Sequence, residues 1–324
     1  MRVIPDSAVD AVLDLEPLLE VVAEAFRRDR AGAVERPDRP HYPVGVGVRD
    51  ENPLGTGLVM PAYIHGSDYA ATKLVGVHEG NKAIGLPTVN AEIVLKSAET
   101  GIPEAVLAGT RITNARTGCI GGLAARELAT ESPVTLGVIG AGAQARWQSR
   151  AIAAATGISE ARIYSPSDSR ESCAADLRAE GIDARAVDSA EDAVADASVV
   201  VTATTATDPV ISGAKLSTGA LVVAVGAYTT EMRELDTETL DRAAQVFGDV
   251  PEEAAETGDF PDHDASAIEP FSDVVAGYAG RQRDDDLIVV KSVGTAVLDA
   301  AAAEDVYERA IEEDVGTEVE MNGV

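Results

Sequence analysis

The chain has 324 residues, of which 45% are hydrophobic and 25% charged, a composition typical of a folded protein that is long enough for two domains. It carries 26 lysine and arginine residues against 55 aspartate and glutamate residues, which gives a formal net charge of −29 at pH 7. This acidic excess argues against binding to nucleic acids or anionic membranes, because both require a basic surface.

The charge also bears on the cellular environment. Only five of the basic residues are lysines. Such a surface repels itself in dilute buffer and is screened in concentrated salt, so we expect a halophilic protein; an acidic mesophilic protein is the alternative. No apolar run approaches the roughly 18 residues of a membrane span, and residues 1–5 lack the apolar core of a secretion signal. These features predict a cytoplasmic location.

Cysteine and histidine usage predicts neither a disulfide framework nor a metal site. Cys119 and Cys173 are far apart and have no histidine cluster nearby, so we expect small buried thiols. The chain has four histidines, none at metal-ligand spacing. No Gly-x-Ser-x-Gly motif is present to supply a serine nucleophile.

The first 120 residues indicate an α+β domain. An amphipathic helix is expected over 15–29, followed by a proline-rich stretch over 36–43. Turn residues then separate the later elements, which are strands at 58–63, 70–78 and 89–97 and a return to helix over 103–128.

The next segment is typical of a dinucleotide-binding turn. The apolar run 134–139 predicts a buried strand, and Gly140-Ala141-Gly142-Ala143-Gln144-Ala145 supplies G-x-G-x-x-A at the start of a helix. Gly140 permits the tight turn, Gly142 lets the backbone approach phosphates, and Ala145 lets the helix lie close to the sheet. The helix N-terminus then faces the negative charge of a pyrophosphate.

The remainder alternates between short apolar runs and helical stretches, which predicts a Rossmann-type doubly wound parallel sheet. The expected strands are 161–164, 184–187, 198–203, 221–225 and 246–248, with helices at 169–180 and 189–196. A strand at Val290 and a helix over 295–313 close the fold, and the tail 315–324 could pair at a sheet edge. We place the NAD(P)-binding domain at 122–292 and the other domain at 1–121 and 293–324.

The cofactor-binding groups are expected at the carboxyl edge of this sheet. After the second strand, Ser165, Ser167 and Arg170 could receive a 2′-phosphate, which favours NADP; Asp168 keeps NAD open as the alternative. The other cofactor contacts expected here are Gly140, Gly142, Ala143, Gln144, Thr117, Thr202, Thr204 and Val225. For Thr202 and Thr204, plain turn capping is an alternative.

Two cations stand in segments otherwise built for packing. Lys73 interrupts the apolar run 70–77, and a buried lysine is costly unless it meets an anion; a lysine on the wet face of the strand is the alternative. Arg116 comes just before the small-residue helical stretch 121–125. An arginine at a helix start opposes the helix dipole and calls for an external anion, with a surface ion pair as the alternative.

Three further residues are candidates for the substrate site. Arg39 lies in the stiff segment 36–40 and could hold a carboxylate, although a solvated loop is equally compatible. His78 ends a strand and could line a pocket, or could be an ordinary polar residue. Tyr228 follows the strand after which the nicotinamide should lie and could face the substrate.

Taken together, these segments resemble the ornithine cyclodeaminase/mu-crystallin family, which includes archaeal alanine dehydrogenases and ketimine reductases. The resemblance spans nearly the whole chain and rests on ordered blocks at 59–63, 73–75, 80–81, 85–88, 110–117, 140–145, 224–227, 232–235, 280–281 and 291–296. It implies a substrate and dimerisation domain, a Rossmann domain, a final helix that returns to the first domain, and a homodimer.

The resemblance also implies roles for particular residues. Arg39, Lys73 and Arg116 would bind the substrate carboxylate, and Lys73 would also transfer a proton near the reacting carbon. Ser292 and Gly294 would close over the nicotinamide ring.

Two departures from the family pattern bear on the reaction. Members that cyclise ornithine have an aspartate where this chain has Tyr228, and a glutamate where it has Leu58. Because tyrosine is a poor base at neutral pH, we expect an NAD(P)-dependent oxidoreductase that acts on the C–N bond of a small 2-amino or 2-imino acid. It would be a ketimine reductase or an alanine dehydrogenase. Ornithine cyclodeaminase is the second hypothesis, and a non-catalytic, crystallin-like NAD(P)H-binding protein is the third.

Overall fold

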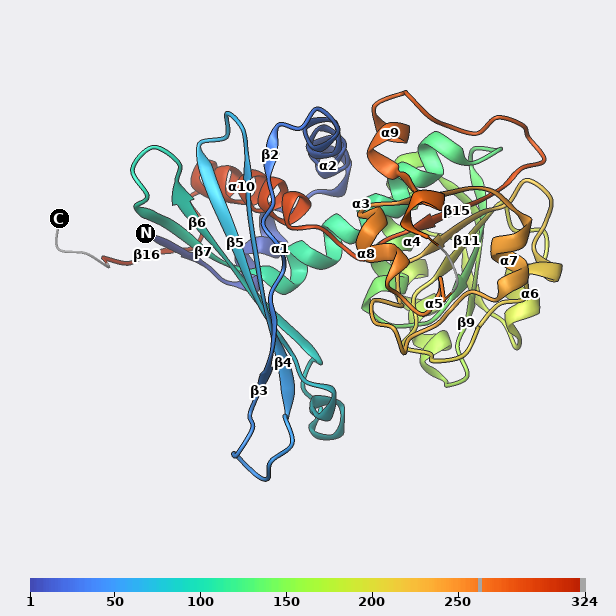
Figure 1. Cartoon of the computed structure of the whole chain (residues 1–324), viewed down its shortest axis with the longest axis horizontal. Helices are drawn as coiled ribbons and strands as arrows, with labels where there is room; N and C mark the ends of the chain where they lie inside the picture. Colours follow the sequence, from blue (N-terminus) through green and yellow to red (C-terminus); the bar gives the residue numbers. More distant parts are fainter. Residues whose placement is uncertain (262–263, 321–324) are drawn as a thin grey trace. The chain divides into compact units, whose positions relative to one another are not determined.

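The computed structural model describes residues 1–261 and 264–320. By their internal contacts the residues divide into two compact units. Figure 1 colours the chain by sequence position, from blue at the N-terminus to red at the C-terminus. Unit 1 comprises 1–14, 31–116 and the chain from residue 295, and unit 2 comprises 15–30 and 117–294. The boundary between residues 116 and 117 falls within helix α3 (Gly109–Leu128).

Unit 1 contains an eight-stranded mixed sheet. Its order is β16 (Thr317–Glu318), β1 (Arg2–Ile4), β7 (Pro103–Ala108), β6 (Val89–Ser97), β5 (Tyr69–Val77), β4 (Gly55–Ile64) and β2 (Val34–Glu35), with β3 (His41–Val44) also paired to β4. Alternate residues of the central strands, such as Ile93 and Leu95, are fully buried, as the period of two in a strand requires. The long helix α10 (Ala296–Glu312) packs on this sheet, and α1 (Asp6–Val12) packs on α10 (Figure 1). The short helix η1 (Glu79–Ile84) follows β5.

The predicted helix over 103–128 is wrong for its first six residues, which form β7. Ala105 and Leu107 are fully buried whereas their neighbours are partly exposed, an alternation typical of a strand. β7 is hydrogen-bonded between β1 and β6, so the sheet outweighs the local helical preference of Glu-Ala-Val-Leu-Ala. The helix α3 begins only at Gly109.

The pairing expected for the tail is confirmed. β16 runs antiparallel to β1, with Arg2 opposite Glu318, and so covers one edge of the sheet. The last part of the predicted tail, residues 321–324, lies outside the described residues.

Unit 2 is built on an eight-stranded parallel sheet. Its order is β10 (Ala184–Ala186), β9 (Ile158–Tyr164), β8 (Val134–Ile139), β11 (Val199–Thr202), β12 (Leu221–Ala224), β15 (Leu287–Lys291), β13 (Ala243–Gly248) and β14 (Glu269–Pro270). Every predicted strand is present, and the first five in chain order lie as third, second, first, fourth and fifth. This is the Rossmann order. The strand order reverses between β8 and β11, and such sheets bind their ligands at that point.

Helices flank this sheet. They are α4 (Ala143–Thr156), α5 (Ser169–Ala179), α6 (Ala190–Val194), α7 (Thr237–Arg242), α8 (Pro251–Ala255) and α9 (Phe271–Val275), with short η2 (Gly213–Lys215) and η3 (Ala265–Ala267). The predicted N-terminal helix is present as α2 (Leu15–Arg30), and it packs on α4 and α9 through contacts such as an edge-on pair of Phe26 and Phe271. By contacts α2 therefore groups with unit 2, whereas the predicted boundary placed all of 1–121 in the other domain.

Some features concern the whole described part of the chain. Cys119 and Cys173 are buried free thiols, as predicted. None of the helices in the described ranges combines the length and apolarity needed to cross a membrane. Within residues 1–261 and 264–320, the histidine, cysteine, aspartate and glutamate side chains form no group of three suited to a metal ion.

Candidate active site

The turn between β8 and α4 has the geometry that a dinucleotide-binding turn requires. Gly140 has φ +116°, a conformation that side chains other than glycine rarely adopt. A Cβ at Gly140 would lie 2.3 Å from the carbonyl oxygen of Ala203, so the end of β8 and the segment after β11 approach each other directly through backbone. The Gly140 N–H donates to the carbonyl of Tyr164 (2.8 Å) and ties the turn to β9.

The N-terminus of α4 is open for an anion. Gly142 is its N-cap and supplies no side-chain hydrogen bond, and a Cβ built there would meet nothing within 4 Å. The first N–H groups of this 14-residue helix thus have no capping side chain, while Ala145 is fully buried against the sheet. Gly142, Ala143 and Gln144 therefore fit the pyrophosphate of a dinucleotide.

Arg146, which the sequence patterns did not single out, braces this turn. Its Nη1 donates to the carbonyls of Ala141 (2.6 Å) and Gly142 (3.3 Å), and its Nε donates to Asp176 (2.8 Å). Gln148 links the first turn of α4 to α3, because its Nε2 donates to the carbonyl of Thr117 (2.8 Å) and to Gln144 Oε1 (3.4 Å).

A serine cluster follows β9, where the adenosine ribose is expected. The hydroxyls of Ser165, Ser167 and Ser169 lie 2.7–3.4 Å apart and form a closed set of hydrogen bonds. Arg170 Nη1 donates to the Ser165 carbonyl (3.0 Å), and its buried Nε has no hydrogen-bond partner among the described residues. Two of the predicted hydroxyls, a third serine and a guanidinium therefore lie together. Asp168 is the N-cap of α5 and makes no side-chain capping bond.

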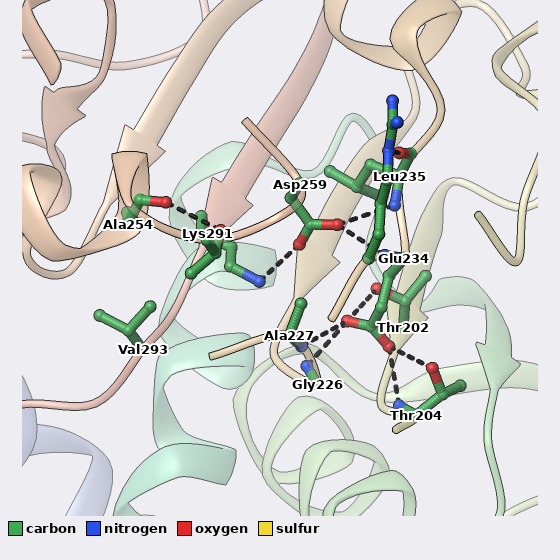
Figure 2. Close-up of polar contacts among 12 residues, drawn as sticks. Thr202, Thr204, Gly226, Ala227, Glu234, Leu235, Ala254, Asp259, Lys291 and Val293 are labelled. Atoms are coloured by element: carbon green, nitrogen blue, oxygen red, sulfur yellow. Dashed lines mark hydrogen bonds and ion pairs between the residues drawn. The ribbon is translucent and has the colours of Figure 1, made fainter. Parts of the chain in front are cut away.

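At the ends of β11 and β12, the predicted threonines contact a carboxylate that the sequence analysis missed. Glu234 is fully buried and accepts from Thr202 Oγ1 (3.0 Å), Thr204 N (2.7 Å) and Thr204 Oγ1 (2.9 Å). It also accepts from the N–H groups of Gly226 (2.8 Å) and Ala227 (3.3 Å) (Figure 2). The Val225 N–H donates to the Thr202 carbonyl (2.9 Å). The threonine hydroxyls are thus engaged within the protein, in line with the capping alternative.

A second buried carboxylate, Asp249 at the end of β13, holds the segment after β15. It accepts from Ser292 Oγ (2.7 Å), Val293 N (2.9 Å) and Gly294 N (2.8 Å). Gly294 has φ +81°, which favours glycine. Ser292 and Gly294, both predicted cofactor contacts, are therefore fixed by one side chain.

Unit 1 contains a buried cluster of charges. Lys73, in the middle of β5, donates to Asp299 Oδ2 (2.5 Å), and Arg116 donates through Nε to Asp299 Oδ1 (2.9 Å) and through Nη2 to Oδ2 (3.4 Å). Thr113 Oγ1 also donates to Asp299 Oδ1 (3.1 Å). All three charged side chains are at most 4% exposed. The wet-face alternative for Lys73 is therefore wrong, since the lysine is buried and meets an anion.

Burial and the neighbouring charges shift the pKa values of Lys73 and Asp299. Burial, together with the positive charges of Arg116 and Arg39, lowers the pKa of Lys73 to about 8, although Asp299 acts in the opposite direction. Burial alone would raise the pKa of Asp299, but Arg116 and Lys73 outweigh it and hold that pKa below its usual value. Lys73 is therefore a cation at neutral pH with a proton that it can give up slightly above neutrality.

Arg116 differs from the prediction in its surroundings. It lies inside α3 rather than at a helix start, because this helix already begins at Gly109. Its ion pair is buried, not on the surface. One amine, Nη1, is buried without a hydrogen-bond partner among the described residues, and a carboxylate is the natural partner for such a guanidinium edge.

The other three candidates lie differently. Arg39 is partly buried and close enough to Lys73 for its charge to lower the lysine pKa. His78 follows the end of β5, about 16 Å along the strand from Lys73, and its ring packs over Gly55 and Gly76. Tyr228 is 44% exposed after β12. The structure thus brings Lys73, Arg116 and Arg39 together, and the roles of His78 and Tyr228 stay predictions.

Asp299 could have been found by the reasoning that singled out Lys73. It stands alone in the apolar stretch 296–303, where the contrast between a charge and its neighbours is strong. Glu234 and Asp249 carry no such pattern, because they lie in loops of ordinary polarity.

Known proteins are similar to this chain over nearly its whole length. The model of the ornithine cyclodeaminase/mu-crystallin family matches residues 3–314. The chain is 32% identical over 332 residues to a Delta(1)-pyrroline-2-carboxylate reductase of Bacillus cereus, covering 99% of this chain and 100% of the relative. It resembles the structure of the Thermococcus litoralis Delta(1)-pyrroline-2-carboxylate reductase in complex with NADH and L-proline, with TM-score 0.92, 32% identity, and 98% and 100% of the two chains covered. It also resembles an archaeal alanine dehydrogenase dimer with bound NAD, with TM-score 0.90, 30% identity and 99% of each chain covered. The chain belongs to the ornithine cyclodeaminase/mu-crystallin family.

Proposed function

We propose that this protein is an NAD(P)-dependent reductase of small cyclic 2-imino acids such as Δ1-pyrroline-2-carboxylate, or of the imine formed from pyruvate and ammonia. The observation that carries the proposal is the buried cluster of Lys73, Asp299 and Arg116, with one guanidinium amine of Arg116 unpaired. A buried lysine with a tuned pKa suits proton transfer, whereas binding alone would not require it. The similarity of the chain to two enzymes, a Delta(1)-pyrroline-2-carboxylate reductase and an archaeal alanine dehydrogenase, supports this class of reaction.

Each unit contributes one part of the chemistry. In unit 1, Arg116 and Arg39 bind the substrate carboxylate, and the Lys73 ammonium gives its proton to the imine nitrogen. In unit 2, Gly140, Gly142, Ala143 and Gln144 hold the pyrophosphate of the cofactor. When bound, the reduced nicotinamide supplies the hydride that the substrate α-carbon accepts. Asp299 keeps Lys73 protonated until the imine nitrogen takes the proton.

Absorbance at 340 nm distinguishes this function from the alternatives. Oxidation of NADPH or NADH with Δ1-pyrroline-2-carboxylate, or with pyruvate plus ammonium, is the expected result. Ammonia and proline from L-ornithine without net absorbance change would instead identify a cyclodeaminase, and cofactor binding without any turnover would identify a ligand-binding protein. Because the chain is so acidic, we propose a salt-adapted cytoplasm as its setting, so the assays are run in molar KCl as well as in dilute buffer.

We further propose that NADP is preferred. The hydroxyls of Ser165, Ser167 and Ser169 and the partly exposed guanidinium of Arg170 supply donors at the end of β9, where a 2′-phosphate lies in Rossmann domains. Arg170→Leu is expected to weaken NADPH binding by about tenfold or more, the loss of one charge-assisted hydrogen bond, and to leave NADH binding unchanged. Calorimetric titration with both cofactors measures this.

The control for that variant is Arg185→Leu, which removes an exposed arginine of β10 that pairs with Glu160. It should bind both cofactors as the wild type does. Equal weakening of NADPH and NADH in Arg170→Leu would contradict a role specific to the 2′-phosphate.

We also propose that the chain forms a homodimer through unit 1. Large exposed apolar side chains gather where β3, η1 and β6 meet one end of the sheet. There the register pairs Val44 with Gly55, Thr56 with Val77, and Val77 with Val89. These side chains are Tyr42, Val46, Val48, Ile84, Leu86 and Val89. Apolar clusters of this kind mark protein interfaces, and the archaeal alanine dehydrogenase relative is a dimer. Light scattering in solution should give twice the mass of one chain, and the monomer mass would reject the proposal.

A further inference from the structure

Glu234 links the ends of two neighbouring strands of the unit 2 sheet. It lies in the loop between β12 and α7, and its two carboxylate oxygens accept five hydrogen bonds from four residues, Thr202, Thr204, Gly226 and Ala227. Three of these donors are backbone N–H groups, which cannot change into acceptors. Each of the two oxygens accepts from at least one of these N–H groups, so both positions of the side chain need an acceptor. Burial raises the pKa of the Glu234 carboxyl, and the nearby Lys291 acts in the opposite direction.

The backbone segments around Glu234 are closely packed. A Cβ at Gly226 would lie 2.2 Å from the Thr204 carbonyl oxygen and 2.4 Å from Glu234 Oε1. The segments 202–204 and 226–227 are thus in direct contact with each other and with the carboxylate (Figure 2). A change in how Glu234 bonds must therefore move at least one of them.

A buried ion pair between Asp259 and Lys291 fixes the backbone at Glu234. Asp259 Oδ1 accepts from the N–H groups of Glu234 (2.6 Å) and Leu235 (2.9 Å), and its Oδ2 accepts from Lys291 Nζ (2.6 Å) (Figure 2). Asp259 and Lys291 are fully buried, and Lys291 is the last residue of β15. The chain of contacts therefore joins the carboxyl ends of β11, β12 and β15, which are adjacent strands.

We propose that Glu234 is a positioning residue that fixes the segments 202–204 and 226–227 against the nicotinamide half of the cofactor. The inference rests on the proposed function, because it takes the carboxyl ends of these strands as the nicotinamide side of the sheet. Glu234 is buried beneath the two segments and acts on the cofactor only through them.

The chemistry of glutamine makes this testable. Glu234→Gln keeps the size of the side chain but replaces one acceptor oxygen by an NH₂ group, which would face either the N–H of Thr204 or those of Gly226 and Ala227. Two donors facing each other repel, so one segment must shift. The matched control is Glu231→Gln, the same change three residues earlier in the same loop at an exposed position.

The experiment compares NADPH with 2′-phospho-ADP-ribose, which lacks the nicotinamide. For Glu234→Gln we expect NADPH binding at least about tenfold weaker and a reduced kcat, with the affinity for 2′-phospho-ADP-ribose within about twofold of the wild type. Glu231→Gln should match the wild type in all three. If Glu234 has only a structural role, Glu234→Gln should lower the melting temperature and bind both ligands as the wild type does, or it should weaken the binding of both ligands by the same factor. Either result overturns the proposal.

A milder variant covers the case in which Glu234→Gln does not fold. Thr202→Val keeps the shape and removes one donor to Glu234, and it should weaken NADPH binding by about threefold without affecting 2′-phospho-ADP-ribose; no change in NADPH binding would count against the proposal. If the wild type binds neither ligand, the proposed function fails and this inference with it. If the wild type binds and turns over but Glu234→Gln behaves as Glu231→Gln does, only this inference fails.

Discussion

Replacing Lys73 with alanine is expected to lower kcat for imine reduction by about 10²- to 10⁴-fold, the range that a positioned general acid contributes. The substitution removes the group that we propose as the proton donor to the imine nitrogen, and Asp299 remains paired with Arg116, so the carboxylate keeps a counterion. Because Lys73 belongs to unit 1 and the glycine turn to unit 2, the Kd for NADPH should change by less than about twofold. Initial rates at 340 nm and a calorimetric titration give the two numbers.

The control for this variant is Lys96→Ala, on the neighbouring strand β6, where the lysine is exposed. It should leave both kcat and Kd unchanged. A Lys73→Ala enzyme that loses turnover and cofactor binding to the same degree would show that Lys73 supports the fold rather than the reaction.

The second large effect is expected from Asp299→Asn, which leaves Lys73 and Arg116 buried without their counterion. Removing one partner from a buried ion pair costs about 3–5 kcal/mol, so the free energy of unfolding should fall by that amount at pH 7. The loss should shrink as the pH rises through the lowered pKa of Lys73, because the neutral amine removes one of the two unneutralised cations. Urea denaturation at several pH values measures it.

The same variant should also shift the pH dependence of the reaction. In the wild type, the rate of reduction should fall as the pH rises through about 8, where Lys73 loses its proton. Asp299 raises the pKa of Lys73, so its replacement must lower that pKa and move the decline to lower pH. The control on the same helix is Asp305→Asn, which removes the carboxylate that pairs with Arg309 and should leave the profile in place. A profile unchanged in Asp299→Asn would exclude Lys73 as the group that titrates.

The Rossmann unit could be predicted because its determinants are local in sequence. The run 134–139 is β8 itself, and the helix begins at Ala143 directly after the two glycines. Buried parallel strands are continuous apolar runs, so each strand of this sheet is visible without knowledge of its neighbours. The run 103–108 was misjudged because it forms a strand only through pairing with β1 and β6.

The candidate site was predictable only in part, for a related reason. A cation among apolar residues identifies Lys73, but its partner lies 226 residues further along the chain. Proximity of that kind depends on tertiary packing, so neither the pairing with Asp299 nor the resulting pKa of Lys73 follows from the local pattern. Glu234 illustrates the limit, because four donor residues and the carboxylate come together from three separate segments.

The discontinuous make-up of unit 1 has a consequence for the order of events on the ribosome. Lys73 and Arg116 are synthesised 226 and 183 residues before Asp299. Because an uncompensated buried cation is strongly unfavourable, the cluster of Lys73, Arg116 and Asp299 cannot form until helix α10 has emerged. Nearly all of unit 2 lies between these segments and is complete by residue 294. Unit 2 can therefore fold before Lys73, Arg116 and Asp299 come together, and the proposed substrate site is assembled only once helix α10 has emerged.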